Sequence, residues 1–241
     1  MIATFKVLSA LLSYPGEEIM AAAPDLMAVV AQENLVPPRL QKQLAKLTGQ
    51  IADGDLFDLQ ERYVVLFDRT RSLSLHIFEH VHGESRDRGQ AMVDLMDLYE
   101  SRGLRIDARE LPDYLPLFLE FLSTLEIDEA RALLAEPLHI ISALKQRHRK
   151  RKSAYTIVFS VLEALARGKA KAADVALLLR EPEDDPDDLE ALDRIWEEEA
   201  VSFGQGASGT VAPDGSCPAA RDLLARMDTP PDAGPKPGLG L

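Results

Sequence analysis

The residues best suited to chemistry form a histidine-rich segment in the middle of the chain. His76 and His80 are four residues apart, His82 follows two residues later, and Glu79 and Glu84 lie among them. Neutral imidazoles and carboxylates are groups that hold zinc, at about 2.0–2.2 Å. However, the order differs from the His-Glu-x-x-His pattern of metalloproteases, and no cysteine accompanies it. We therefore favour polar packing or partner binding, and keep a metal-dependent enzyme that uses the three histidines as an alternative.

A run of charges of both signs follows directly, over residues 83–89. Arg86 and Arg88 could bind a phosphate group. The run nevertheless lacks the glycine spacing and the Gly-Lys-Ser/Thr ending of a Walker loop. Arginine and carboxylate groups can pair through two parallel hydrogen bonds. We therefore interpret the run as an ion-pair network that ties a loop to the next helix.

A second polar element is the sequence Leu-Pro-Asp-Tyr-Leu-Pro over residues 111–116. Asp113 is a candidate N-cap for the helix that follows. Pro116 would then lie in the first turn, where its missing N–H costs nothing because that donor has no partner within the helix. The free N–H groups of such a helix start, with Tyr114 beside them, could bind carbonyl and carboxyl groups of a peptide. An ordinary capped helix start explains the same residues equally well.

Catalysis and nucleic-acid binding find little support in the sequence. The single cysteine, Cys217, lies in a Gly- and Pro-rich region, and no Gly-x-Ser-x-Gly elbow occurs. The basic run at residues 145–152 is short and lacks interleaved aromatic residues, so we interpret it as a solvated connection or helix end. The net charge of −13 opposes binding to phosphate backbones. An acidic chain would favour a basic peptide or protein partner, although the charge can also serve solubility alone.

The elements that position these residues are expected to be helices. Hydrophobic residues make up 46% of the chain, and Leu and Ala dominate them. Apolar residues recur at helical spacing along most of the sequence. This periodicity predicts helices over residues 5–12, 19–30, 40–51, 56–67, 89–101, 115–125, 129–144, 155–162 and 175–179. The predicted fold class is therefore all-α.

Several details of these helices can be predicted as well. Asp55 and Asp128 are candidate N-caps, and Gly103 is a good stop for the helix over residues 89–101. In that helix, the expected inward-facing residues are Met92, Leu95, Met96 and Tyr99. The preceding segment, with its histidines, is expected to be partly irregular, with two turns of helix around residues 75–80.

The composition changes after residue 180. Residues 181–199 hold eleven acidic residues and one arginine, with apolar residues at helical spacing. This pattern predicts an acidic amphipathic helix that docks on the body. From residue 204 the chain is rich in Gly, Pro, Ser and Ala, which predicts a disordered tail. We expect one helical domain over residues 1–203 and a flexible tail over residues 204–241.

The N-terminal sequence predicts a cytoplasmic protein. It begins Met-Ile-Ala-Thr-Phe-Lys, without the basic start and small-residue cleavage site of a signal peptide. No apolar run approaches the ~20 residues that span a bilayer. A single thiol also fits a reducing compartment, because it cannot form an internal disulfide. We therefore expect no stable insertion into a membrane.

Several long motifs resemble those of the NarJ-type nitrate reductase assembly chaperones. The most specific is Phe-Glu-His-Val-His-Gly-Glu-Ser-Arg-Asp-Arg-Gly-Gln-Ala-Met-Val-Asp over residues 78–94. Residues 63–69, 109–117 and 196–203 and the N-terminal Leu-Leu-Ser-Tyr-Pro over residues 11–15 also match. The similarity covers roughly the first five-sixths of the chain. Related chaperones carry an Asp-His pair where this chain has Asp113 and Tyr114, which weakens any role that needs an imidazole there.

The resemblance implies a single-domain helical bundle of the wider TorD-like class of redox-enzyme chaperones. It implies a protein that is not an enzyme, needs no cofactor of its own, and binds the catalytic (alpha) subunit of respiratory nitrate reductase, chiefly at its N-terminal segment. Binding would assist insertion of the molybdenum cofactor before the client attaches to its membrane anchor. Proteins that make the cofactor are further expected partners. The resemblance further implies a role in nitrate assimilation and the binding of unfolded protein.

Together, residues and resemblance predict a groove that accepts an amphipathic helix or strand of the client. The predicted client-binding residues are Phe67, Asp68, His80, His82, Glu84, Arg86, Asp113, Tyr114, Pro116 and Glu120. A carrier that holds molybdopterin directly with Arg86 and Arg88 stays a second alternative.

Overall fold

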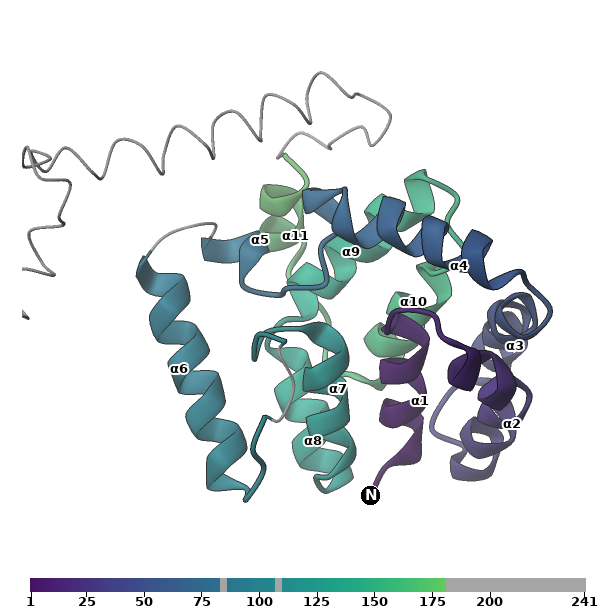
Figure 1. Cartoon of the computed structure of the whole chain (residues 1–241). Helices are drawn as coiled ribbons and strands as arrows, with labels where there is room; N and C mark the ends of the chain where they lie inside the picture. Colours follow the sequence, from purple (N-terminus) through teal and green to yellow (C-terminus); the bar gives the residue numbers. More distant parts are fainter. Residues whose placement is uncertain (83–85, 107–109, 181–241) are drawn as a thin grey trace, which may run out of the picture. The chain divides into compact units, whose positions relative to one another are not determined.

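A computed structural model of the chain describes residues 1–82, 86–106 and 110–180 (Figure 1). Over these ranges the regular elements are helical, which confirms the all-α prediction. The predicted acidic helix after residue 180 and the predicted tail over residues 204–241 lie outside the described residues. The α-helices are α1 (Ala3–Leu12), α2 (Glu17–Glu33), α3 (Pro38–Ala52), α4 (Leu56–Tyr63), α5 (Glu79–His82), α6 (Arg86–Ser101), α7 (Leu115–Ser123), α8 (Ile127–Ala135), α9 (Leu138–Lys150), α10 (Thr156–Leu165) and α11 (Ala172–Leu178).

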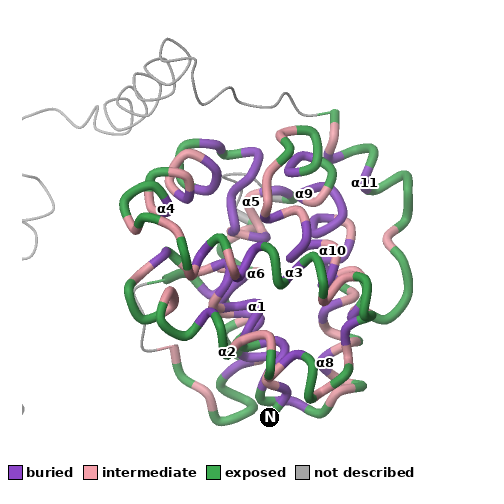
Figure 2. Tube along the Cα trace, turned by 90° about the vertical axis from the view of Figure 1, so that its right-hand side faces the viewer, coloured by how far each residue is buried: buried purple, intermediate pink, exposed green. Residues whose placement is uncertain are grey.

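The core forms around three helices that are apolar on nearly every side. Helix α1 packs closely on α7 and also contacts α10, which packs mainly on α9, because a helix without a polar face is stable only when it is enclosed. Helices α2 and α3 pack on each other at one side of the body, and α6 lies at the opposite side (Figure 1). In Figure 2 the buried stretches gather in the interior, and long stretches of α2, α4 and α11 are exposed.

The N-terminal half of the fold follows the predicted periodicity closely. The predicted helices over residues 5–12, 19–30 and 40–51 correspond to α1, α2 and α3. Asp55 caps α4 as predicted, because its carboxylate accepts hydrogen bonds from the N–H groups of Phe57 and Asp58 at 2.9 and 3.2 Å. Helix α4 then continues as a π-helical turn, Val64–Asp68, and a 3₁₀ turn follows at Arg71–Leu73.

Four predictions about the later helices were wrong in detail. The helix predicted over residues 129–144 is divided at Pro137 into α8 and α9, since proline cannot donate a hydrogen bond inside a helix. Asp128 lies in the first turn of α8, and Glu126 is its N-cap. Helix α6 begins three residues earlier than predicted, and its Met96 faces solvent with 43% of its surface exposed. Gly103, with φ of +75°, does follow the end of α6.

The histidine-rich segment is less helical than predicted. Residues 75–78 precede the four-residue α5, and His76 forms an isolated antiparallel bridge with Tyr114. Leu75 and Ile77 are buried on one side of this stretch, so alternation of apolar and polar residues outweighs helical periodicity here. The bridge places the histidine-rich segment against the start of α7.

The basic run, predicted to be a solvated connection or helix end, is a helix end, but part of it is not solvated. Residues 145–150 form the last two turns of α9, where Arg147 and His148 are buried. The Arg147 guanidinium donates hydrogen bonds to the carbonyl oxygens of Ser72 at 2.7 Å and Leu178 at 2.6 Å. A buried cation thereby joins α11 to the 3₁₀ turn at Arg71–Leu73.

Candidate functional site

The centre of the candidate site is Asp113, whose side chain is fully buried. One carboxylate oxygen lies 3.2 Å from Nδ1 of His76, and the other accepts the N–H of Phe78 at 3.1 Å. The Asp113 carbonyl oxygen also accepts the N–H of Ile77 at 3.0 Å. Asp113 is therefore an acceptor that fixes residues 76–78. It is not the N-cap of α7, because Tyr114 occupies that position without a side-chain cap.

His76 is the titratable partner of this carboxylate. About a quarter of its side chain, 26%, is exposed. The hydrogen bond to Asp113 raises the pKa of His76 above its usual value, and the charges of Asp113 and Glu79 act in the same direction, although burial opposes them. The imidazole therefore holds its proton to higher pH than a solvated histidine does.

Arg88, in the first turn of α6, completes the polar cluster. Its guanidinium lies 3.5 Å from Oε1 of Glu79 and 3.9 Å from Oδ2 of Asp113. Of the charged run, Arg88 thus forms ion pairs with residues outside the run, and a network within residues 83–89 stays a prediction. We call Asp113, His76, Arg88 and Glu79 the Asp113 cluster.

A pair of tyrosines joins the Asp113 cluster to the core. The hydroxyl oxygens of Tyr63 and Tyr114 are 2.9 Å apart, and Tyr63 also donates to the carbonyl oxygen of Leu12 at 2.9 Å. Tyr114 must then donate to Tyr63, because Tyr63 has only one hydroxyl hydrogen. Burial raises the pKa of both phenols, so both stay protonated. The pair fixes the start of α7 relative to α1 and α4.

An apolar groove of about 280 Å³ lies beside the Asp113 cluster. Ile77 and Phe78 belong to its wall, so the residues that Asp113 holds in place also shape the groove. Val81 is half exposed at its edge. The lining residues are Ile77, Phe78, Val81, Leu95, Leu98, Phe118, Leu133, Glu136, Pro137, His139 and Ile140. They come from α5, α6, α7, α8 and α9 and the segments beside them.

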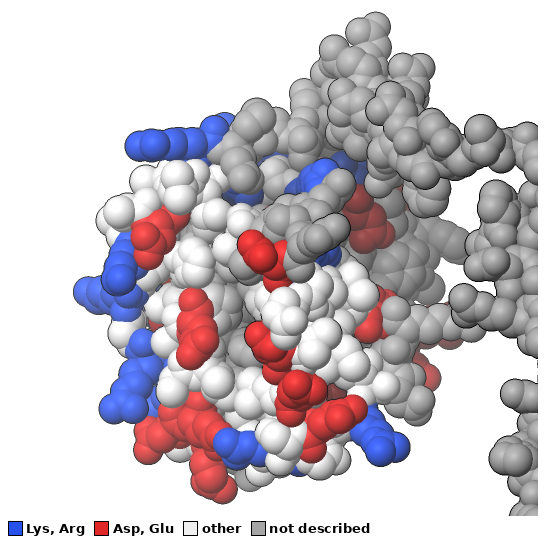
Figure 3. All heavy atoms as spheres, turned by 90° about the vertical axis from the view of Figure 1, so that its left-hand side faces the viewer, with Lys and Arg blue, Asp and Glu red and all other residues white. Residues whose placement is uncertain are grey.

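One acidic residue, Glu136, lines this groove, and other acidic residues are exposed on the helices around it. Asp94, Asp97 and Glu100 are exposed on α6, and Glu126 and Glu136 are exposed at the two ends of α8. Figure 3 views the face that carries α6 and shows acidic side chains across it, with Lys and Arg mostly toward its margins. Such an acidic surface attracts positively charged groups.

Comparison with known proteins shows which family the chain belongs to. The sequence profile of the nitrate reductase delta subunit family matches residues 33–160, which include the Asp113 cluster. The chain belongs to this family. It is 40% identical over 197 residues to the nitrate reductase molybdenum cofactor assembly chaperone NarJ of Escherichia coli, covering 82% of this chain and 83% of that protein. A probable chaperone of the same description from Bacillus subtilis is 35% identical over 161 residues, covering 67% of this chain and 86% of that protein.

The chain is similar to the same extent to a second Escherichia coli protein, the probable nitrate reductase molybdenum cofactor assembly chaperone NarW. It is 40% identical over 198 residues, which cover 82% of each chain. These findings confirm the resemblance that the motifs predicted. The relatives are named as chaperones and not as enzymes, which agrees with the prediction that this delta subunit family member is not an enzyme.

In this delta subunit family member, part of the predicted site lies together. Asp113 and Tyr114 are at its centre, and buried His80 lies beside them with Nε2 2.9 Å from the carbonyl oxygen of Ser74. Asp68 is exposed, and partial desolvation and the charge of Glu110 raise its pKa. Glu84 lies outside the described residues, as do the side chains of His82 and Arg86.

None of the predicted client-binding residues is among the residues that line the groove, and three of them lie away from the Asp113 cluster. Phe67 is in the aromatic core, 4.8 Å from Tyr63 between ring centroids. Pro116 is buried in the first turn of α7, and its carbonyl oxygen accepts the hydroxyl of Ser9 at 2.7 Å. Glu120 is half exposed in a different pocket, 3.5 Å from Nζ of Lys6.

The described structure gives no support to the two alternative functions, a metal-dependent enzyme and a direct carrier of molybdopterin. Within the described ranges, no three His, Cys, Asp or Glu side chains come together in a way that could hold a metal ion. Arg88, which a pterin carrier would need, is engaged with two carboxylates. Also within these ranges, no helix combines the length and the apolar character required to cross a bilayer.

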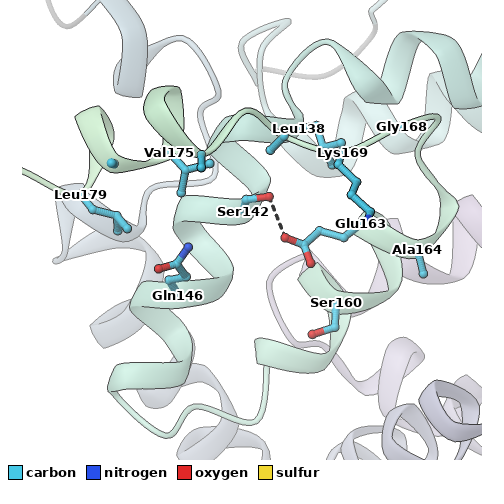
Figure 4. Close-up of a pocket in the computed structure, with 13 residues that line it drawn as sticks. Leu138, Ser142, Gln146, Ser160, Glu163, Ala164, Gly168, Lys169, Val175 and Leu179 are labelled. Carbon is cyan, nitrogen blue, oxygen red and sulfur yellow. Dashed lines mark hydrogen bonds between the residues drawn. The ribbon is translucent and has the colours of Figure 1, made fainter.

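A larger pocket, of about 670 Å³, lies between α9, α10 and α11, away from the Asp113 cluster (Figure 4). Unlike the groove, it is not lined by the residues that Asp113 holds in place, Ile77 and Phe78. Its polar floor is already occupied by internal interactions, because the Glu163 carboxylate accepts the hydroxyl of Ser142 at 2.6 Å and pairs with Lys145. The side chain of Lys169 extends toward Glu163 in Figure 4. We therefore place the functional site at the groove beside the Asp113 cluster.

Sequence reasoning missed the pairing of His76 with Asp113 and the position of Arg88. The two members of the first pair are 37 residues apart. No periodicity within one sequence connects such residues. The buried pair Arg147 and His148 could have been found, because these residues continue the buried stripe of Ile140, Ile141 and Leu144 at helical spacing.

Proposed function

We propose that this protein is a system-specific chaperone that binds the catalytic subunit of a respiratory nitrate reductase. In this proposal it acts in the cytoplasm, before the client attaches to the membrane, and assists insertion of the molybdenum cofactor. Membership of the delta subunit family and the names of its relatives support this function. The observation that carries the proposal is an apolar groove beside a buried polar cluster, since a groove of this kind suits an extended or helical peptide.

The occupant that fits the groove is an amphipathic segment with apolar anchors and basic flanks. The lining is predominantly apolar, so side chains such as Leu or Phe would provide most of the affinity. Glu136 and the exposed acidic residues of α6 and α8 would attract Lys or Arg on the polar side of the segment. We assign this segment to the N-terminal part of the catalytic subunit, as the sequence resemblance implies.

The polar residues of the region would fix the register of the bound segment. Asp113 would act by positioning Phe78 and Ile77, since it is itself buried. Tyr114 and Asp68 are accessible enough to contact the client directly. For His80, His82, Glu84 and Arg86, a contact with the client stays a prediction. Phe67, Pro116 and Glu120 would contribute by holding α4 and α7 in place.

Binding would assist cofactor insertion without any bond being made or broken by the chaperone. A client that can open and close exists as two populations, and a partner that binds only the open form increases its share. The proteins that make the molybdenum cofactor would then meet a client that is held open. Release would follow once the inserted cofactor favours the closed form.

Two matched substitutions test the groove. Val81 lines the groove and is 50% exposed, whereas Val93 on α6 does not line it and is 49% exposed. Burial of a valine contributes about 1.5–3 kcal/mol, and a charge in its place adds a desolvation cost, so Val81→Asp should weaken client binding at least about tenfold. Val93→Asp introduces the same charge outside the groove and should leave the affinity within about twofold, since it adds only an exposed charge.

Isothermal titration calorimetry with a synthetic peptide of the client's N-terminal segment would measure both affinities. Circular dichroism would verify that both variants keep the wild-type helix content. Equal affinities for Val81→Asp and wild type would remove the groove from the binding site. Failure of the wild-type protein to bind either the peptide or the unassembled catalytic subunit would refute the proposed function itself.

A further inference from the structure

Helix α6 is firmly attached to the body at its C-terminal end. Tyr99 is the buried residue of this helix, and its hydroxyl donates to the carbonyl oxygen of Pro112 at 2.8 Å. Its ring lies 4.6 Å from the ring of Phe121 between centroids. Just beyond the helix, both terminal nitrogens of Arg102 bind the carboxylate of Glu129. This end of α6 has the features of a fixed pivot.

The opposite end of α6 is attached differently. Asp87, Gly89 and Gln90 are exposed, and among the described side chains of this first turn Arg88 makes the ion pairs to the body. Its distances of 3.5 Å to Glu79 and 3.9 Å to Asp113 exceed those of a hydrogen-bonded pair, at about 2.7–2.9 Å. The attachment is therefore electrostatic and long, and it is weaker than the packing of Tyr99.

The apolar groove lies between these two attachments. Leu95 and Leu98 of α6 form one wall, and Phe118, Leu133 and Ile140 lie on the other side. Its volume is about 280 Å³. A helix with its side chains is about 10–12 Å wide, and drug-sized ligands already need about 300–1,000 Å³. At about 280 Å³ the groove lies just below this range, so an outward movement of its α6 wall would give more room to the apolar face of a bound segment.

We propose that Arg88 is a positioning residue that holds the N-terminal end of α6 over the groove. When its ion pairs with Glu79 and Asp113 separate, α6 swings about its Tyr99 end and the groove widens. The inference rests on the proposed function for its purpose, which is regulated admission of the client, but the movement itself can be measured without any client. Arg88 acts through the position of Leu95, one turn from the pivot, and does not itself bind the client.

The movement can be followed by the distance between two spin labels. Cys217, the single cysteine, is first replaced by serine, and labels are attached through Val93→Cys on α6 and Ala132→Cys on α8, both of which are exposed positions. Pulsed electron resonance then gives the distance distribution in the full-length protein. Arg88→Gln should add a population at longer distance. Arg88→Lys keeps the charge and should retain most of the short-distance population.

The matched control is Arg102→Gln, which removes the ion pair at the pivot end of the same helix. Tyr99 still anchors that end, so this variant should give the wild-type distribution. The proposal is overturned if Arg88→Gln gives the wild-type distribution, or if Arg102→Gln lengthens the distance as much as Arg88→Gln does. In the latter case α6 would be loosely attached along its whole length.

Peptide binding gives a second, independent readout. A partly exposed ion pair changes an equilibrium by about two- to fivefold, so Arg88→Gln should accelerate association of the client peptide by that factor. Slower association, without a change in the label distances, would mean that Arg88 contacts the client and would overturn the positioning role. If wild-type protein binds no peptide, the proposed function fails, and the label distances still decide whether Arg88 holds α6.

Discussion

Substitution of Asp113 by asparagine gives the sharpest test of the Asp113 cluster. The side chain is fully buried and accepts hydrogen bonds from His76 and from the N–H of Phe78. Asparagine has nearly the same shape but a single acceptor oxygen. If that oxygen accepts the N–H of Phe78, the amide NH₂ faces His76. The substitution therefore removes one charged hydrogen bond without creating a cavity.

The expected loss of stability follows from the number of interactions removed. A hydrogen bond to a charged group contributes about 1.5–3 kcal/mol, so Asp113→Asn should lower the free energy of unfolding by about 2 kcal/mol near neutral pH. Asp113→Ala removes both acceptors and leaves the N–H of Phe78 without a partner. Breaking a buried pair in this way should cost about 3–5 kcal/mol.

The loss should also depend on pH, with a definite sign. The pKa of His76 is raised in the folded protein, mainly by its hydrogen bond to Asp113. This interaction therefore contributes stability that is fully present below the unfolded pKa of about 6.5 and is lost as the pH rises through the higher folded pKa. Because Asp113→Asn removes the charge that raises this pKa, its destabilising effect should be larger near pH 6 than near pH 8.5.

Urea unfolding at both pH values, followed by circular dichroism, would measure these differences. Nuclear magnetic resonance would follow the titration of the His76 ring, whose pKa should fall in Asp113→Asn. Asp94→Asn is a suitable control, because this carboxylate is exposed on α6 and bonds only with Gln90 in the described structure. Equal losses at the two pH values, with an unchanged His76 titration, would refute the charge-pairing account of the cluster.

Three further predictions concern the supports of the site and can be measured by the same unfolding assay. Tyr63→Phe should lower the free energy of unfolding by about 1–3 kcal/mol and Tyr114→Phe by about 0.5–1.5 kcal/mol, because the Tyr63 hydroxyl bonds to two partners and the Tyr114 hydroxyl to one. Equal losses in the two variants would contradict this order. Arg147→Met should cost about 2–4 kcal/mol, since two buried carbonyl oxygens lose their donor, and a loss under 1 kcal/mol would contradict it. Burial lowers the pKa of His148 to about 3. The stability that the neutral ring contributes is therefore present above the unfolded pKa of about 6.5 and is lost as the pH falls. We expect His148→Leu to flatten the decline in the free energy of unfolding between about pH 6 and pH 4.

Much of the fold could be predicted because the apolar spacing and the capping residues of the core helices are visible in the sequence itself. Phe5, Leu8 and Leu12 mark α1 by spacing alone, and all three are buried. Asp55 was predictable as a cap because an N-cap interacts with N–H groups only two or three residues away. Met96 was predicted incorrectly, since periodicity assumes that the apolar stripe faces a body along its whole length. Helix α6 packs on the core through Leu95, Leu98 and Tyr99, and Met96 lies on its exposed side.

The region of the site was predictable, and the roles of its members were not. The motif over residues 78–94 and the sequence Leu-Pro-Asp-Tyr-Leu-Pro both pointed to it. Asp113 was nevertheless assigned to a local cap, because local rules connect a carboxylate to nearby N–H groups. Its real partners, His76 and the N–H of Phe78, come from a segment more than 30 residues earlier. Only the tertiary fold selects such a partner over a local one.

The burial of Asp113 explains why the polar and apolar parts of the site must be considered together. A buried carboxylate is stable only if its oxygens interact with donors or cations. The oxygens of Asp113 interact with a backbone N–H and a histidine and, at 3.9 Å, with the guanidinium of Arg88. The first two partners shape the groove wall at residues 76–78, and the third belongs to α6, which forms another wall. One buried charge is thus linked to two walls of the same groove. Any change that removes this charge should therefore alter both the free energy of unfolding and the width of the groove. Both effects should appear together in Asp113→Asn.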